Sequence, residues 1–186
     1  MQVYLAGPDV FLADARAIGQ RKCERLQADG LQGRFPLDAE LDLEGLTPRE
    51  MGRRIFNANR ELMDRCQAAL VHLTPFRGPS ADAGTVLEVG YLFARGVPII
   101  GYSGDARPYA ARVAGPRRHW DADDMRIEHF DLPDNLMIPL AIEASSGEVV
   151  TAEGHQMSAA EAARDMGLFD RAVKALVQRV GRRPAD

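Results

Sequence analysis

Two carboxylates, Asp82 and Glu88, stand six residues apart in the run TPFRGPSADAGTVLEVGY (residues 74–91). Asp82 falls in a loop, and Glu88 falls about one turn into the helix predicted for residues 85–95. Because an α-helix rises ~1.5 Å per residue, both carboxylates can face one cleft with ~10 Å between their backbone positions. Paired acids of this kind can divide a reaction between a nucleophile and a group that handles the proton.

A structural interpretation of the same residues stays open on spacing alone. A helical glutamate is usually a solvated surface residue, and an aspartate before a helix is usually its N-cap. The neighbours of Glu88, however, are largely apolar, and they include Val86, Leu87, Val89 and Leu92. A glutamate on such a helix either finds a small exposed window or is held in a pocket for a purpose.

The elements that must position these acids follow from the alternation of short apolar runs with helical patterns. Strands are predicted for residues 3–6, 33–37, 68–73, 97–102 and 149–150. Helices are predicted for residues 14–28, from Thr47-Pro48 onward, 85–95, 135–143 and 158–180. Thr47 as N-cap, with Glu50 three residues later, predicts a capping box at the second of these helices. This order predicts an α/β fold, a flavodoxin-like (Rossmann-like) parallel sheet of about five strands with helices on both faces.

Ligands of such sheets bind at the carboxyl ends of the strands. That rule points to three segments of this chain: residues 7–11, residues 74–84 and the loop after Tyr102. The stretch 103–126, rich in Gly, Pro, Arg and Asp, is predicted to be a surface loop.

Length and composition bound the class of protein. The 186 residues, 46% hydrophobic and 27% charged, are expected to form one domain over residues 1–186. Its C-terminal extension, residues 146–186, is expected to be mostly helical. That helix could cap the sheet, bury against a partner subunit or close the pocket.

Charge and cysteine content narrow the partners. A net charge of −4 disfavours nucleic acid as a partner, and no run approaches the ~18 apolar residues of a membrane helix. Cys23 and Cys66 form no CxxC pair, and the four histidines show no zinc-site spacing, so no metal is expected. Two reduced thiols and the absence of a signal-like start indicate a cytoplasmic protein.

Three blocks carry a resemblance to a known family. YLAGPDVF (4–11), LTPFRGPSADAGTVLEVGY (73–91) and DNLM (134–137) resemble the nucleoside 2-deoxyribosyltransferase family in sequence, order and spacing. The resemblance covers roughly residues 1–140, and the central block is its most specific part. It implies exchange of the base of a 2′-deoxynucleoside through a covalent deoxyribosyl ester, with retention of configuration and without a cofactor.

The resemblance also assigns roles to residues. Glu88 matches the nucleophile, Asp82 the acid beside it, and Tyr4 the tyrosine near the catalytic carboxylate. The expected substrate-binding residues are Gly7, Phe11, Asn59, Gly84, Asn135 and Met137. Phe11 would pack on the base, whereas Asn59 stands where lactobacillal members carry an Asp, which leaves the base preference open.

The resemblance implies a homo-oligomer, at least a dimer with shared active sites. Asn135 and Met137 match residues that reach into the neighbouring subunit's site, Asn135 toward the 5′-hydroxyl. The partners expected are therefore small 2′-deoxynucleosides, free nucleobases and further copies of this chain.

Two other functions stay open. The same arrangement could hydrolyse 2′-deoxynucleosides or their 5′-monophosphates, for which Arg77 and Ser80 are the nearby hints. A non-catalytic nucleotide-binding module is the third hypothesis. The chain lacks a GxxxxGK[ST] loop, and the strand 68–73 ends without a phosphate-accepting Asp. An intact Glu88 also argues for an enzyme.

Overall fold

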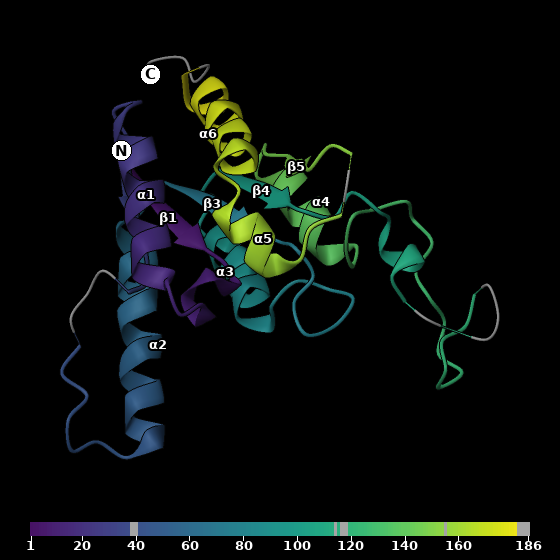
Figure 1. The fold of residues 1–186 in the computed structure, drawn as a ribbon, viewed down its shortest axis with the longest axis horizontal. Helices are drawn as coiled ribbons and strands as arrows, with labels where there is room; N and C mark the ends of the chain where they lie inside the picture. Colours follow the sequence, from purple (N-terminus) through teal and green to yellow (C-terminus); the bar gives the residue numbers. More distant parts are fainter. Residues whose placement is uncertain (38–40, 114, 116–118, 155, 182–186) are drawn as a thin grey trace.

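A five-stranded, all-parallel β-sheet forms the centre of the computed structural model, which describes residues 1–37, 41–113, 115, 119–154 and 156–181. The strands are β1 (Gln2–Ala6), β2 (Gln32–Arg34), β3 (Ala68–His72), β4 (Ile99–Ser103) and β5 (Val149–Thr151). In the sheet they follow the order β2-β1-β3-β4-β5, as Figure 1 allows the reader to trace. This is the flavodoxin-like order, which confirms the predicted fold.

The strand order reverses between β1 and β3. From β1 the chain crosses to β2 on one side, and from β3 it continues to β4 on the other. Connections that leave in opposite directions open a crevice outside the carboxyl ends of the two strands. This fold therefore places a ligand site where Gly7 follows β1 and Leu73 follows β3.

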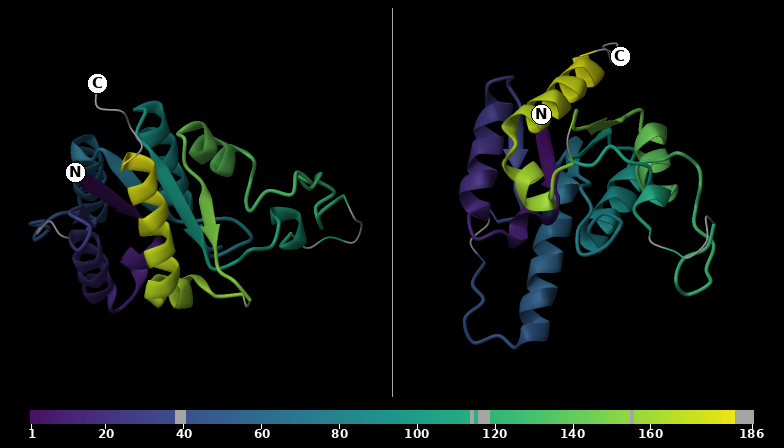
Figure 2. Two further views of the ribbon diagram at one scale, coloured as in Figure 1. Left: turned by 90° about the horizontal axis from the view of Figure 1, so that it is seen from above. Right: turned by 45° about the vertical axis from the view of Figure 1, so that its right-hand side comes forward.

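Helices cover both faces of the sheet (Figures 1 and 2). The helices are α1 (Ala15–Gln27), α2 (Pro48–Arg65), α3 (Ala83–Ala94), α4 (Met137–Ala144), α5 (Ala159–Arg164), α6 (Met166–Gly181) and the 3₁₀ turns η1 (Pro8–Phe11) and η2 (Tyr109–Ala111). Two hydrophobic clusters result, one between the sheet and α1 and α6, the other between the sheet and α2, α3 and α4.

Side chains of β1 alternate between these two clusters, as the period of a strand requires. Val3 and Leu5 pack in the cluster with α1 and α6, whereas Tyr4 and Ala6 pack in the cluster with α3. A slip of one residue would exchange the two sets. The apolar pattern of β1 therefore fixes which face of the sheet receives the phenol of Tyr4.

The C-terminal part of the chain completes the core. Helix α6 contributes five fully or almost fully buried side chains, Leu168, Phe169, Ala172, Val173 and Leu176. Of the three roles open for this segment, the described part caps the sheet, while residues 155 and 182–186 lie outside the described residues.

The single helix predicted for residues 158–180 is wrong in one respect, because it is two helices. The chain turns at Asp165, where the backbone is extended (φ −75°, ψ 96°). The Asp165 carboxylate accepts a hydrogen bond from the Leu168 amide at 2.9 Å. It thereby caps α6, as aspartates do at helix starts.

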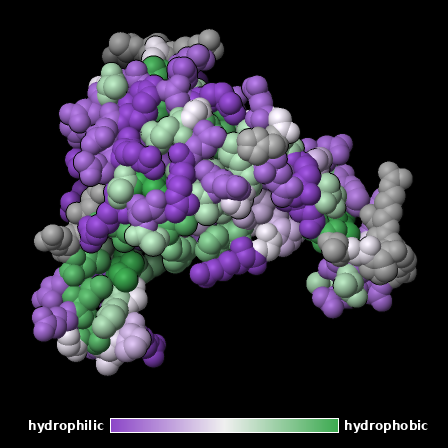
Figure 3. All heavy atoms as spheres, viewed as in Figure 1, coloured by the Kyte–Doolittle hydropathy of each residue, from purple (hydrophilic) through white to green (hydrophobic). Residues whose placement is uncertain are grey.

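Two parts of the molecule project from this body (Figures 1 and 2). The amino end of α2 extends away from the sheet, and Thr47 caps it through the predicted capping box with Glu50. Hydrophobic residues gather over this end in Figure 3. Phe56, in the middle of α2, is 54% exposed.

The second projection is the segment between β4 and α4. Its described part holds η2 and one isolated bridge, between Trp120 and Arg126. The loop predicted for residues 103–126 is thus largely irregular and continues to α4. Among the residues the structure describes, no helix is long and apolar enough to cross a membrane.

Candidate active site

A cavity of about 160 Å³ lies at the carboxyl edge of the sheet, beside the crevice between β1 and β3. Segments from four parts of the chain line it: the turn after β1, the residues after β2, helix α2 and the first turns of α3. The lining residues are Gly7, Val10, Phe11, Pro36, Leu37, Ile55, Asn59, Asp82, Gly84, Thr85 and Glu88. Six predicted site residues, Gly7, Phe11, Asn59, Asp82, Gly84 and Glu88, are thus brought together.

Glu88 is half-buried on α3, with its carboxylate on the phenol of Tyr4. The Tyr4 hydroxyl donates to Glu88 Oε1 at 2.5 Å. Burial raises the pKa of Glu88 to about 7, the charge of Asp82 adds to that rise, and the hydrogen bond from Tyr4 opposes it. Glu88 is therefore a carboxyl group held in a pocket, poised to change charge near neutral pH.

Tyr4 is fully buried on β1. Burial raises the pKa of its phenol far above the usual value, and the charge of Glu88 raises it further. The hydroxyl therefore stays protonated at neutral pH and always donates. A donor fixed in this way stabilises the charged form of Glu88.

Asp82 is both an N-cap and a lining residue of the cavity. Its Oδ2 accepts hydrogen bonds from the Thr85 amide at 2.9 Å and from Thr85 Oγ1 at 3.0 Å. Both bonds use the same oxygen, so the cap does not engage Oδ1. A Cβ at Gly84 would lie 3.1 Å from Asp82 Oδ2, so the absence of a side chain there gives the carboxylate room.

The turn after β1 needs glycine at position 7. Gly7 has a φ of 153°, and a Cβ on it would lie 2.6 Å from the Cβ of His72 on β3. This close approach sets η1 directly over the end of β3. Phe11, at the end of η1, is thereby carried to the mouth of the cavity.

Phe11 belongs to an exposed aromatic wall. Its ring, 58% exposed, stacks on that of Phe76 with centroids 5.4 Å apart and planes 10° apart. The Arg77 guanidinium lies over both rings, 5.2 Å from the centroid of Phe11 and 4.6 Å from that of Phe76. A flat, partly exposed ring is a suitable surface for a planar heterocycle.

Asn135 and Met137 do not line this cavity. The Asn135 side-chain amide donates to Glu128 Oε1 at 2.6 Å, and its Oδ1 accepts from the Met137 amide at 3.1 Å. Met137 itself is 70% exposed. Their expected role in a neighbouring subunit's site stays a prediction.

Sequence reasoning missed a buried polar network directly beneath η1. Asp9, between Gly7 and Phe11, pairs with Lys22 of α1 and with His72 Nδ1, the latter at 2.5 Å. Lys22 also donates to the Tyr102 hydroxyl at 2.9 Å. The signal was a histidine in the otherwise apolar run AALVHL, together with an aspartate at a strand end.

The far side of this network ends on Thr74. His72 Nε2 lies 2.6 Å from Thr74 Oγ1, which in turn accepts from the Gly104 amide at 2.8 Å. The order Asp9, His72, Thr74 is that of a nucleophile triad. However, the hydroxyl of Thr74 is buried (the residue is 1% exposed), so no substrate reaches it. The network therefore holds η1 in place rather than performing chemistry.

The charges of this network compensate one another. Burial alone would raise the pKa of Asp9, but the contacts with His72 and Lys22 outweigh it and hold that pKa below its usual range. Burial lowers the pKa of Lys22, and Asp9 opposes that change. Each charge is tolerated in the core because the other is present.

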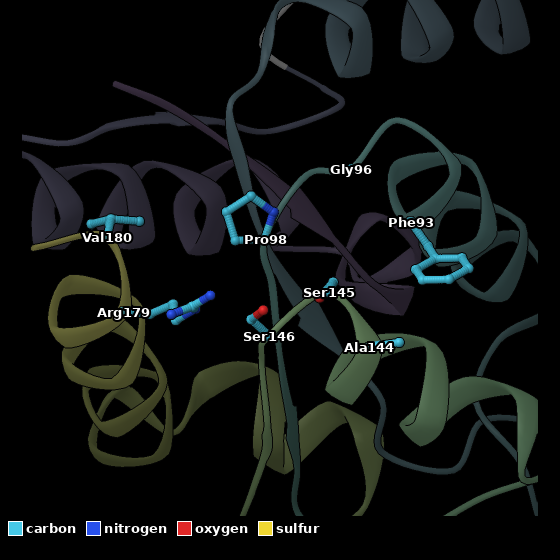
Figure 4. Close-up of a pocket in the computed structure, with 8 residues that line it drawn as sticks. All are labelled: Phe93, Gly96, Pro98, Ala144, Ser145, Ser146, Arg179 and Val180. Carbon is cyan, nitrogen blue, oxygen red and sulfur yellow. The ribbon is translucent and has the colours of Figure 1, made fainter. Parts of the chain in front are cut away.

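A second cavity, of about 200 Å³, lies at the amino end of β4, next to Pro98 (Figure 4). In Figure 4 Arg179 extends toward Ser146, and the described residues that line the cavity include no carboxylate. Helices α3, α4 and α6 all end there, and their partial negative charge suits Arg179 and disfavours an anion. This cavity therefore lacks the paired acids of the first.

The fold and the first cavity define a class of protein: a flavodoxin-like domain with two acids in a cavity at its switch point. The sequence profile of the nucleoside 2-deoxyribosyltransferase family matches residues 3–137. The chain belongs to this family. The matched range contains Tyr4, Asp82 and Glu88.

Individual proteins are similar to this chain in sequence or in structure. An uncharacterized protein of Schizosaccharomyces pombe is 36% identical over 126 residues, which are 67% of this chain and 60% of that relative's length. A 2-desoxiribosyltransferase from Leishmania mexicana is similar in structure, with a TM-score of 0.63 and 25% identity, over 93% of this chain and 97% of the other. A conserved protein from Enterococcus faecalis shares the fold, with a TM-score of 0.59 and 20% identity, over 96% and 98% of the two chains.

The network beneath η1 leads to a stability prediction. Lys22→Met removes a buried charge and leaves Asp9 without its cation, which we expect to lower the free energy of unfolding by about 3–5 kcal/mol. Lys174→Met is the matched control, because Lys174 is exposed and its ion pair within the described residues is with Asp170, one turn away. Its cost should stay below about 1 kcal/mol. Urea unfolding of both variants measures the difference, and equal stabilities would contradict the role given to Lys22.

Proposed function

We propose that this protein is a nucleoside 2-deoxyribosyltransferase in which Glu88 is the nucleophile, Asp82 handles the proton of the base and Tyr4 orients Glu88. The observation that supports this best is the half-buried Glu88, with its pKa near 7, on the Tyr4 hydroxyl and beside Asp82 in a cavity. Exchange of free bases of this kind suits salvage in the cytoplasm.

The first half-reaction forms the glycosyl-enzyme. A Glu88 carboxylate oxygen bonds to C1′ as the C1′–N bond to the base breaks, and that electron pair leaves with the base. The positive charge that develops on the sugar is stabilised by the carboxylate. The departing base takes a proton from Asp82 or from a water next to it.

The second half-reaction reverses the first with a different base. A nitrogen of the incoming base attacks C1′ on the face that the first base left, the ester bond to Glu88 breaks, and the base's proton returns to Asp82. Two inversions give retention. Water as the acceptor would give free deoxyribose instead. A sugar without a 2′-hydroxyl forms the cationic transition state more easily, hence the 2′-deoxynucleoside.

The remaining cavity residues are proposed to bind the substrate. Phe11, backed by Phe76 and Arg77, would stack on the base. Asn59 offers an amide donor and acceptor to the edge of the base from the α2 side. Gly7 and Gly84 let the backbone approach the sugar.

A transfer assay tests the proposal. Purified protein is incubated with deoxyinosine, with and without adenine, and the products are separated by chromatography. We expect deoxyadenosine only when adenine is present. Glu88→Ala should abolish it, while Glu148→Ala, at an exposed glutamate beside β5, should stay within about twofold of the wild type.

Other products would favour the alternatives. Hypoxanthine and free deoxyribose without deoxyadenosine would replace the transferase by an N-glycosidase. If the protein turns over neither deoxyinosine nor pyrimidine donors nor 5′-monophosphates, the remaining hypothesis is a non-catalytic nucleotide-binding module.

The Tyr4–Glu88 hydrogen bond predicts a pH effect. Glu88 must be ionised to attack, so kcat/KM for base release should rise with pH through a midpoint near the Glu88 pKa of about 7. The bond stabilises the charged form, so Tyr4→Phe should raise that pKa and move the midpoint up by about one unit. Tyr91 lies on α3, as Glu88 does, but its hydroxyl donates to Asp64. Tyr91→Phe should therefore leave the midpoint unchanged. A midpoint that stays or falls in Tyr4→Phe would contradict this role.

We further propose a homo-oligomer, at least a dimer, whose subunits complete each other's sites. Helices α3 and α4 pack together, and both expose large apolar side chains: Leu87 (62%), Phe93 (42%), Met137 (70%) and Leu140 (42%). Such apolar exposure is typical of a surface that another chain covers. Asn135 and Met137 stand at this surface rather than in their own subunit's cavity.

Mixing two inactive variants tests shared sites. If Asn135 serves the neighbour, Glu88→Ala and Asn135→Ala should each lose most activity alone. After mixing and reassembly about half of the dimers contain one chain of each variant, and one of the two sites in such a dimer carries both Glu88 and Asn135. The mixture should therefore recover about a quarter of the wild-type activity. Size-exclusion chromatography with light scattering reports the assembly. A monomer, or no recovery on mixing, would overturn the proposal.

A further inference from the structure

The segment between β4 and α4 projects from the body of the molecule, yet two buried charges anchor its base (Figures 1 and 2). The side chains of Arg112 and Asp134 are each only 3% exposed. Charged side chains are rarely buried to this degree without a purpose that repays their desolvation.

Arg112 joins three backbone segments. Its guanidinium donates to the carbonyl oxygens of Pro79 at 2.8 Å, Arg107 at 2.7 Å and Pro133 at 2.5 Å. Its Nη2 also lies 3.8 Å from Asp134 Oδ2. The loop that precedes α3 is thereby tied to the backbone near both ends of the projecting segment.

Asp134 completes the connection on the side of the active site. Its carboxylate accepts hydrogen bonds from the Ser80 hydroxyl and, at 2.9 Å, from the Ala81 amide. Ala81 is followed directly by Asp82, the N-cap of α3. Asp134 also accepts from the Asn135 amide at 2.7 Å, so one carboxylate holds the approach to Asp82 and the start of the segment with Asn135 and Met137.

We infer that Asp134, held by Arg112, is a positioning residue that sets Asp82 at the start of α3 and orients Asn135 at the same time. The inference rests on the proposed function, because Asp82 and Asn135 matter for catalysis only if the base exchange takes place. It adds a residue that touches no substrate. The carboxylate is suited to this because its two oxygens accept from three donors at once.

Asp134→Asn tests this role with almost no change in shape. An amide has one acceptor oxygen, so its NH₂ group must face either the Ala81 or the Asn135 amide, donor against donor. Asp131→Asn is the matched control: Asp131 lies in the same segment, is exposed, and has a φ of 55° that asparagine tolerates well. Ser80→Ala removes the hydroxyl contact and keeps that of the Ala81 amide.

The kinetic measurement is kcat per active site, with sites counted from the base released in the first turnover. We expect Asp134→Asn to lower kcat per site by about ten- to a hundredfold, with a smaller change in the KM for the acceptor base. Ser80→Ala should lose about two- to fivefold. Asp131→Asn should stay within about twofold of the wild type. A merely structural residue would reduce the number of sites and leave kcat per site unchanged, which would overturn the inference.

Hydrogen–deuterium exchange of residues 79–88 gives a second readout that needs no substrate. The Ala81 amide and the first turn of α3 should exchange faster in Asp134→Asn than in the wild type or Asp131→Asn. Unchanged exchange would overturn the inference. If the wild-type protein releases no base, the proposed function fails, and exchange alone then decides whether Asp134 positions the loop. Should Asp134→Asn not fold, Ser80→Ala supplies both measurements.

Discussion

The hydrogen bond from the Tyr4 phenol to the half-buried carboxylate of Glu88 is the interaction on which the arrangement of this site depends. Burial disfavours the charged Glu88, and the Tyr4 hydroxyl stabilises it, so the two effects bring the pKa to about 7. A fully solvated glutamate would be ionised but hydrated, and a fully buried one would stay protonated. Glu88 is the intermediate case, which requires Tyr4 and Glu88 to lie within hydrogen-bond distance of each other.

That placement is a consequence of the sheet. Tyr4 lies on a central strand whose apolar alternation fixes its direction, and Glu88 lies on the helix that leaves the neighbouring strand β3. Because the two strands belong to one hydrogen-bonded ladder, their separation hardly varies. The walls of the cavity, by contrast, lie outside this ladder. Two buried charge pairs hold those walls, Asp9 with Lys22 under η1 and Asp134 with Arg112 behind the loop before α3.

The sequence allowed the prediction of those features whose causes are local. The apolar runs of β1, β3 and β4 and the capping box at Thr47 depend on neighbouring residues, and the structure confirms them. The features that were missed depend on contacts between residues that are separated in the sequence. Nothing near Lys22 indicates that it meets Asp9, and nothing near Asp134 indicates that it accepts from Ser80, 54 residues away. The break at Asp165 was missed because helical spacing continues through it, while the cap forms with Leu168.

Local position along α3 explains how Asp82 and Glu88, only six residues apart, have different surroundings. Asp82 uses its Oδ2 to cap α3, where it accepts from the Thr85 amide and hydroxyl at the positive end of the helix. Among the described residues Glu88 has a single donor, the Tyr4 hydroxyl, and it lies against apolar neighbours one to two turns further along. The helix thus supplies unequal environments by its own polarity. A short run from a helix start to its buried face is sufficient to give one acid two hydrogen-bond donors, and the other a single donor and a raised pKa.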